Sequence, residues 1–326
     1  MYSELDYTFQ AMGSEVRLLI GRPLDPRSPA PPVAADREHD FVLTFARRLS
    51  RFEPDSDLSV FNRAHSASVA ASPLLRAGVA AGLWAAERSG GLVDPTLVQA
   101  LEKGGYAHSR DGVAPASLTE ALAAAPARRP AQAHPAARWR MIEVDEEVGT
   151  ITRPPGVMVD TGGTGKGLCA DAVALRLRGY TRYVVDCGGD IAVGGLGAEF
   201  EPHEIAIEHP LTGAVVGTVR LRRGGIATSG LNIRLWKNPD GSFGHHLLDP
   251  STGQPAWTGL VGATAIAASA LEAETLSKMA LLMGPLGARE VLSEHGGVVV
   301  HDDGEVEAIG PIETAPAPER TATTVG

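Results

Sequence analysis

Residues 157–171 read VMVDTGGTGKGLCAD, with four glycines in six residues around one lysine, Lys166. The apolar residues 157–159 predict a strand that ends at Asp160, and the apolar spacing after the glycines predicts a helix over 167–178. Glycine lets a ligand approach the main chain closely, and the first turn of a helix attracts anions. This order of strand, glycine loop and helix therefore predicts a binding site for a phosphate group.

Two known phosphate-loop patterns do not fit this stretch. A Walker loop requires Gly, four residues and then Gly-Lys-Ser/Thr, but Asp160 stands at the first glycine position and Gly167 at the hydroxyl position. The dinucleotide pattern GxGxxG is also excluded, because the glycines fall at 163, 165 and 167. A glycine-rich turn that only feeds a core helix stays open as a structural alternative.

The composition indicates a globular chain. Its 326 residues are 44% hydrophobic, which is enough for a full core. With 29 basic and 39 acidic residues the net charge is −10, and no long basic run is present, which argues against binding nucleic acid or an anionic membrane. The start of the chain has no signal-peptide pattern, and no apolar stretch is long enough to span a membrane, so we expect a cytoplasmic protein. Cys169 and Cys187 lack CxxC spacing and are expected to pack in the core.

Hydrophobic periodicity and turn residues predict the elements along the rest of the chain. Helices are expected over 38–51, 56–59, 73–89, 118–124 and from a capping box at Ser269 to Gly284. Strands are expected over 7–20 with a turn at Gly13, and over 139–144, 149–152, 183–185, 191–193, 204–208, 215–221 and 261–267. Residues 22–36 predict a Pro-rich loop, residues 107–138 an Ala/Pro-rich excursion from the core, and residues 311–326 a disordered tail.

Eight segments, in order along the chain, resemble those of the ApbE family, the FAD:protein FMN transferases. They are AMGS (11–14), SRFEPDSDLSVFN (50–62), GGLVDPT (90–96), VDTGGTGKGLCAD (159–171), DCGGDIAVGG (186–195), ATSG (227–230), HLLDPSTGQP (246–255) and SALEAETLSKMALLMG (269–284). One such piece would be a weak signal. Together they cover residues 7–300 and are typical of that family.

The resemblance implies one α+β domain over 1–310, with mixed or antiparallel sheets and helices around an extended FAD cleft. It implies that the chain cleaves the FAD pyrophosphate, attaches FMN through a phosphoester to a Ser or Thr of an acceptor protein, and releases AMP. The acceptor is expected to carry a short Ser/Thr-Gly-Ala-Ser/Thr motif. Two alternatives stay open: an FAD pyrophosphatase that releases FMN and AMP, and a catalytically silent flavin-binding protein.

The resemblance also assigns candidate contacts with FAD. These are Met12, Phe52, Leu92, Val93, Asp94, Gly162, Gly163, Lys166, Ser229, Gly230, His246 and Leu247. Lys166 is expected to offset phosphate charge, and His246 to do acid/base work on the acceptor hydroxyl, because imidazole titrates near neutral pH. Asp249 either orients His246 or caps the turn before Pro250.

The metal signature of the family is altered in this chain. The family has Ala-Asp followed four residues later by Thr, with magnesium as the usual ion at the pyrophosphate; here these positions hold Glu274 and Lys278. The resemblance implies metal ligands at Gly165, Glu274 and Ser277, but an ammonium repels a cation. Three accounts are open. Lys278 supplies the charge itself, Ser277 or Thr275 supplies the hydroxyl, or Glu274 and Lys278 form an ordinary i, i+4 pair in an inactive site.

Overall fold

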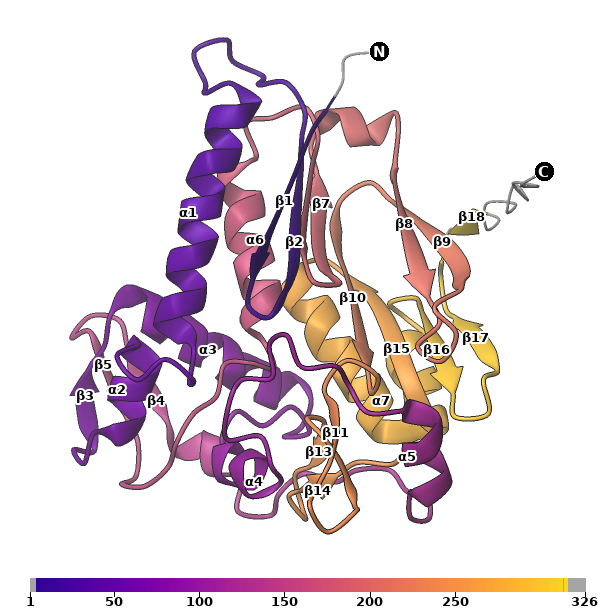
Figure 1. Cartoon of the computed structure of the whole chain (residues 1–326). Helices are drawn as coiled ribbons and strands as arrows, with labels where there is room; N and C mark the ends of the chain where they lie inside the picture. The colour runs from indigo at the N-terminus through magenta and orange to yellow at the C-terminus, as the bar shows by residue number, and fades with distance from the viewer. Residues whose placement is uncertain (1–3, 313, 316–326) are drawn as a thin grey trace.

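A central sheet of eight strands organises the part of the chain that the computed structural model describes, residues 4–312 and 314–315 (Figure 1). Each pairing between its neighbouring strands is antiparallel. In spatial order the strands are β1 (Leu5–Ala11), β2 (Ser14–Ile20), β6 (Tyr183–Cys187), β7 (Asp190–Gly194), β10 (Gly224–Gly230), β15 (Leu260–Ala267), β16 (Gly297–His301) and β17 (Val306–Ile309).

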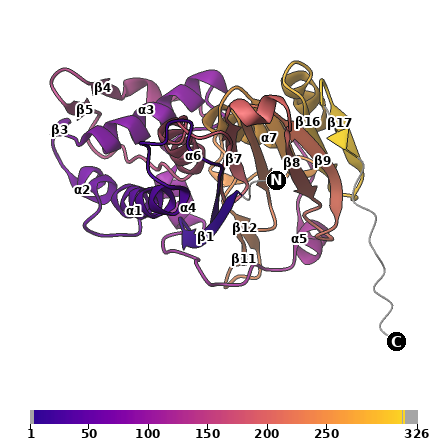
Figure 2. The ribbon, with the colours of Figure 1, turned by 90° about the horizontal axis from the view of Figure 1, so that it is seen from above.

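Most of the helices gather on one side of this sheet, and α5 lies apart from them, as the view from above shows (Figure 2). They are α1 (Pro31–Leu49), α2 (Asp57–Arg63), α3 (Pro73–Arg88), α4 (Val98–Lys103), α5 (Leu118–Ala124), α6 (Gly165–Arg176) and α7 (Ala270–Leu292), with 3-10 turns at Arg138–Met141 and Leu196–Glu199. Helix α6 packs on β6 and β7, and α7 packs on β10 and β15. The four strands in the middle of the sheet therefore carry the two helices that meet at the glycine loop.

Short sheets surround this framework. They are β3 (Ser68–Ala70) with β5 (Thr150–Thr152) and β4 (Glu143–Asp145), β8 (His203–Glu208) with β9 (Val215–Leu221) and β18 (Thr314–Ala315), β11 (Leu235–Lys237) with β12 (Phe243–His245), and β13 (Leu248–Asp249) with β14 (Gln254–Pro255). The β8–β9 hairpin covers the sheet face opposite α6. Side chains alternate accordingly, since Val185 packs among the helices and Val184 packs with Ile207 and Val219 of the hairpin.

The first turns of α6 and α7 hold each other in place. The carboxylate of Asp171 in α6 accepts hydrogen bonds from the backbone N–H groups of Ala270 and Leu271, at 2.8 and 2.9 Å. In return, Glu274 in α7 accepts the N–H of Gly167 at 2.9 Å. Each helix start thus receives a carboxylate from the other helix. The carboxylate accepts hydrogen bonds from N–H groups that have no partner within their own helix, and its negative charge is attracted to the positive end of the helix dipole.

Most of the predicted elements are present. The hairpin over 7–20, the helices over 73–89 and 118–124, and the strands over 183–193 and 204–221 lie within one to three residues of their expected bounds. The Ser269 hydroxyl accepts the N–H of Glu272 at 3.2 Å, which confirms the cap of α7. A second helical segment then extends α7 to Leu292, beyond a kink at Gly284. The chain is α+β, as predicted.

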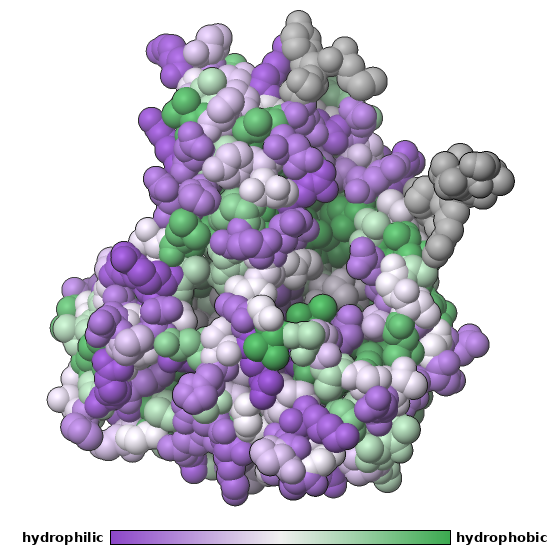
Figure 3. Space-filling view, viewed as in Figure 1, coloured by the Kyte–Doolittle hydropathy of each residue, from purple (hydrophilic) through white to green (hydrophobic). Residues whose placement is uncertain are grey.

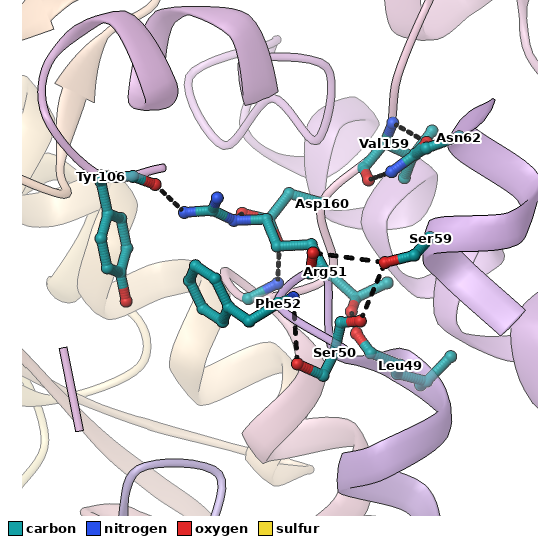
Figure 4. A network of polar contacts seen from close by, with 11 residues as sticks. Leu49, Ser50, Arg51, Phe52, Ser59, Asn62, Tyr106, Val159 and Asp160 are labelled. Carbon is teal, nitrogen blue, oxygen red and sulfur yellow. Dashed lines mark hydrogen bonds and ion pairs between the residues drawn. The ribbon is translucent and has the colours of Figure 1, made fainter. Parts of the chain in front are cut away.

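The strand predicted over 157–159 is wrong. These residues have no regular secondary structure and join no sheet. The side chain of Asn62 instead takes the place of a neighbouring strand, since its Nδ2 donates to the Val159 carbonyl and its Oδ1 accepts the Val159 N–H, both at 2.8 Å (Figure 4). A side-chain amide carries the same donor and acceptor as a peptide group, and no local pattern reveals this substitution.

Three further boundaries differ from expectation. The loop predicted over 22–36 ends early, because α1 begins at Pro31, and proline is favoured in the first helical turn. The strand predicted over 139–144 begins as a 3-10 turn, and its pairing starts only at Glu143. Of the predicted disordered tail, Thr314–Ala315 forms a short strand beside β9. The rest of that prediction, at 313 and 316–326, lies outside the described residues.

Candidate active site

A cleft of about 660 Å³ opens where the β1–β2 turn, the glycine loop, the end of β10 and α7 meet. Its mouth lies in the hollowed middle of the face seen in Figure 3. The volume is typical of a site for a cofactor-sized molecule. Most of the predicted site residues line it: Met12, Phe52, Leu92, Val93, Asp94, Gly162, Gly163, Gly165, Lys166, Ser229, Gly230, His246, Leu247 and Lys278. Glu274 and Ser277 lie behind its wall, fully buried.

The glycines of the central loop have different reasons to be glycine. None of the four has a positive φ, so no turn conformation requires them. A methyl group on Gly167 would lie 2.7 Å from the Ala270 carbonyl oxygen, which shows that α6 and α7 need this glycine to approach each other. Methyl groups on Gly163 and Gly165 would meet nothing closer than 4.0 Å. These two positions border open cleft, where a bare backbone matters only to a ligand.

The start of the loop is held by groups that themselves line the cleft. Asp160 accepts the N–H of Gly162 at 2.9 Å and pairs with the Arg51 guanidinium at 3.1 Å. Arg51 also donates to the carbonyl of Tyr106 at 2.7 Å, so the glycine loop, the segment after α1 and the residue before the 107–138 excursion are joined at one point (Figure 4). The loop therefore has a defined shape before any ligand arrives.

Lys166 lies in the cleft beside a buried carboxylate. Its Nζ is 2.7 Å from Asp190, which is 1% exposed, and donates to the Gly188 carbonyl at 3.2 Å. Burial by itself would lower the pKa of Lys166, but the carboxylates of Asp190 and Glu274 outweigh it and raise that pKa. Lys166 is therefore charged at any physiological pH.

Lys278 brings a second ammonium to the cleft from α7. Its Nζ is 2.8 Å from Glu274 Oε1, and the side chain is 11% exposed. The other oxygen of Glu274, Oε2, accepts the Gly167 N–H. Burial raises the pKa of Glu274 to about 7, and repulsion from Asp190 adds to it, while the Lys278 ammonium opposes the rise. The Glu274–Lys278 pair is thus buried beside the glycine loop and is no surface i, i+4 pair.

The residues at the expected metal position do not fit a magnesium ion. Both oxygens of Glu274 have partners, the Lys278 ammonium on Oε1 at 2.8 Å and the Gly167 N–H on Oε2 at 2.9 Å. The Ser277 hydroxyl donates to the Glu274 carbonyl at 3.0 Å and bonds with Ser229 at 2.8 Å, while that of Thr275 donates to the Leu271 carbonyl.

Among the described residues, no three His, Cys, Asp or Glu side chains are grouped as a metal ion would require. The hydroxyls of Ser277 and Thr275, the proposed substitutes for the missing threonine, are both hydrogen-bonded to other protein groups.

His246 lies between β12 and β13 and borders the cleft. Its Nδ1 is buried and has no hydrogen-bond partner among the described residues. Burial lowers the pKa of His246 to about 3, with repulsion from His245 and Lys278 as smaller causes. The imidazole is neutral at pH 7, and its unpartnered nitrogen is available to a bound molecule.

The carboxylates next to these groups serve as turn caps. Asp249 accepts the N–H of Ser251 at 3.0 Å and that of Gln132 at 3.1 Å, so it fastens the excursion to the turn and does not orient His246. Asp94 accepts from the N–H and the hydroxyl of Thr96, at 2.7 and 2.6 Å, and also lines the cleft.

The β1–β2 turn presents Met12 to the cleft. Met12 has φ 53° and Gly13 φ 68°, the left-handed pair that a two-residue hairpin turn requires. A methyl group on Gly13 would lie 2.2 Å from both Arg234 and Asp111, and Arg234 donates to the Gly13 carbonyl at 2.9 Å. The left-handed conformation is costly for methionine, whose side chain both lines the cleft and packs against the core.

Aromatic rings and guanidinium groups form one wall of the cleft. The Phe52 and Tyr106 ring centroids are 5.5 Å apart, and the Arg51 guanidinium lies 4.2 Å from the first ring and 4.7 Å from the second. Tyr106 lies 5.5 Å from Trp236, with the rings inclined by 31°. Such a wall suits a planar ring system.

The prediction from sequence missed several residues at this site. Asp190, Arg51 and Asp160 lie inside the segments that resemble the family. Their charged side chains in those segments could have marked them as partners of the glycine loop and of Lys166. Tyr106 and Arg234 come from segments whose composition indicates only a loop, and no sequence pattern singles them out. They reach the cleft because the excursion and the 231–234 turn fold over it.

The comparisons with known proteins identify the family of this chain. The profile of the ApbE family matches residues 12–301. An FAD:protein FMN transferase of Klebsiella pneumoniae is 31% identical over 257 residues, covering 77% of this chain and 71% of the relative. One of Treponema pallidum is 29% identical over 288 residues, covering 83% of this chain and 78% of the relative.

Solved structures share the fold over nearly its whole length. The apo form of the flavinyl transferase ApbE of Pseudomonas stutzeri has a TM-score of 0.74 and 25% identity, covering 94% of this chain and 95% of the other. The ApbE protein of Thermotoga maritima has the same TM-score at 24% identity, covering 94% and 97%. With the family profile spanning nearly the entire described chain, this protein belongs to the ApbE family.

Proposed function

We propose that this protein is an FAD:protein FMN transferase. It takes FAD into the cleft, attaches FMN through a phosphoester to a Ser or Thr hydroxyl of an acceptor protein, and releases AMP. The observation that carries the proposal is the open backbone at Gly163 and Gly165 beside two ammonium groups, in a cleft large enough for a dinucleotide. The printed names of the relatives support the same activity.

Each part of FAD has a matching part of the cleft. The diphosphate suits the glycine loop at the start of α6, where Lys166 and Lys278 supply positive charge. The ring systems suit Met12, whose thioether packs well on aromatic faces, and the wall that contains Phe52. Leu92, Val93, Asp94, Ser229, Gly230 and Leu247 complete the proposed contacts.

The reaction transfers a phosphoryl group between two oxygen atoms. The acceptor hydroxyl oxygen forms a bond to the phosphorus that carries the riboflavin moiety, the bond to the bridging oxygen breaks, and that oxygen leaves with AMP. Negative charge that develops on the phosphate oxygens is stabilised by the Lys166 and Lys278 ammonium groups. Both lysines are held by buried carboxylates, so little reorganisation accompanies the reaction.

His246 is the proposed acceptor of the hydroxyl proton. Its imidazole is neutral in the empty cleft because burial lowers its pKa. A diphosphate bound between His246 and the lysines would raise that pKa towards neutrality, since negative charge favours the imidazolium. FAD binding would thus make the imidazole a better base at the moment it is needed.

The acceptor and the compartment belong to the proposal as well. The acceptor is proposed to present a Ser or Thr in a Ser/Thr-Gly-Ala-Ser/Thr segment. No helix among the described residues is long and apolar enough to cross a membrane. We propose the cytoplasm because Cys169 and Cys187 are free, fully buried and in contact, as in a reducing compartment.

The proposal is tested by incubating the purified protein with FAD, with and without an acceptor domain that bears the motif. AMP release is measured, and flavin fluorescence on the acceptor is read from a denaturing gel. AMP together with a fluorescent acceptor is expected, and His246→Gln should lower the rate by about a hundredfold or more. AMP without acceptor would indicate a pyrophosphatase instead, and bound but intact FAD under all conditions would indicate a silent binder.

A further inference from the structure

Lys278 brings a buried ammonium group to the cleft beside the glycine loop. Its side chain extends from α7 towards the glycine loop, and a methyl group on Gly163 would lie 4.0 Å from Lys278 Cε. The loop itself borders open space on the same side. A phosphate group on the loop would therefore lie against the Lys278 ammonium.

The partner of Lys278 is already fully engaged. Glu274 is 0% exposed, with one oxygen on the Lys278 ammonium at 2.8 Å and the other on the Gly167 N–H at 2.9 Å. A divalent ion that used Glu274 as a ligand would have to displace the ammonium or lie beside it. Two like charges that close repel strongly in a buried site. Lys278 therefore excludes the ion from the position that it fills.

The two cleft lysines also supply an amount of charge suited to a diphosphate. The chain has only four lysines, and two of them line this cleft. They approach from different helices, Lys166 at the start of α6 and Lys278 in the third turn of α7. Each is neutralised by one carboxylate, Asp190 or Glu274, when the cleft is empty.

We propose, on the basis of the transferase function above, that this protein binds the diphosphate of FAD and transfers FMN without a divalent cation, because the Lys278 ammonium supplies the charge covalently. The arrangement is built in: the counter-ion of Lys278 caps α6, and its neighbour Ser277 is held by Ser229 at 2.8 Å. This buried ammonium facing the glycine loop argues against the alternative in which Glu274 and Lys278 form an ordinary pair in an inactive site.

The experiment measures the dissociation constant for FAD from the quenching of flavin fluorescence, in EDTA and in excess magnesium. The wild-type protein should bind FAD equally in both, within about twofold. Lys278→Met, which keeps the length and loses the charge, should weaken binding in EDTA by about tenfold to a hundredfold, the effect of one charge-assisted hydrogen bond. Lys237→Met removes an exposed lysine outside the cleft and should change nothing.

Two further variants separate charge from folding. Lys278→Met leaves Glu274 buried without its partner, so the double variant Glu274→Gln with Lys278→Met serves as a version in which the pair is neutral. It should also bind FAD weakly in EDTA. Glu274→Asp with Lys278→Thr should bind FAD more tightly when magnesium is added. With the acceptor domain present, AMP release by the wild-type protein should proceed in EDTA at a rate close to that in magnesium.

The outcomes distinguish this inference from the proposed function. Tight FAD binding and AMP release by the wild-type protein only in magnesium would refute metal independence and leave the transferase intact. Unchanged FAD binding in EDTA by both Lys278→Met and the double variant would also refute it. If the wild-type protein bound no FAD under either condition, the transferase proposal itself would be wrong.

Discussion

The clearest test of how the glycine loop works compares two of its glycines. Gly167→Ala would place a methyl group 2.7 Å from the Ala270 carbonyl oxygen and 2.8 Å from Leu271 Cα, both of them backbone atoms. Ordinary contacts begin near 3.4 Å, so α6 and α7 must separate by several tenths of an ångström. The Gly167 N–H would then lose its alignment with Glu274.

The cost can be estimated from its parts. Overpacking of a tight contact costs about 1–3 kcal/mol, and weakening a hydrogen bond to a carboxylate costs about 1.5–3 kcal/mol. The higher helix propensity of alanine offsets about 1 kcal/mol. The free energy of unfolding should therefore fall by about 1.5–5 kcal/mol. With an unfolding entropy of about 2.1 cal/mol/K per residue, the melting temperature of this chain should fall by about 2–7 °C.

Gly163→Ala is the matched control, because its methyl group would meet nothing closer than 4.0 Å. Its free energy of unfolding should stay within about 0.5 kcal/mol of wild type, while FAD binding should weaken by tenfold or more as the methyl group enters the cleft. Urea unfolding and FAD titration of both variants provide the measurements. Wild-type stability in Gly167→Ala, or wild-type FAD affinity in Gly163→Ala, would refute this account of the loop.

Three other perturbations follow from the structure. Met12→Gly should stabilise the fold by about 1 kcal/mol by relieving a left-handed methionine, yet weaken FAD binding; equal affinity would show that the Met12 side chain is idle. Asn62→Ala should cost about 2–4 kcal/mol in urea unfolding, because both polar groups of Val159 lose their partner, and a loss below 1 kcal/mol would contradict that role. His245 is neutral in the fold, with its pKa lowered by burial to about 3 from an ordinary 6.5, so its stabilisation is complete above pH 6.5 and is lost as the pH falls below it. His245→Phe, which keeps a ring against Trp257, should flatten the fall of unfolding free energy between pH 6 and 4 by up to about 1.4 kcal/mol per pH unit; an unchanged slope would refute the assignment.

Local sequence determined the elements whose signals are local. The capping box at Ser269, the turn at Gly13 and the periodicity over 118–124 each predicted an observed boundary, because the residues that make the contact are three or four apart. Most of the candidate site residues that the motifs identified do line one cleft. Their order along the chain was sufficient to recognise the family.

Tertiary structure alone decided what those residues do. Residues 157–159 look like a strand, but a distant asparagine supplies the hydrogen bonds that a strand would. The spacing of Glu274 and Lys278 is visible in the sequence and is typical of a weakly stabilising surface pair. Folding buries that pair between two helices and the glycine loop, at 0% exposure for the carboxylate. Burial leaves the Lys278 ammonium fixed in position and facing the cleft. The energy of a charge interaction depends on the polarity of its surroundings, and no local sequence pattern encodes those surroundings.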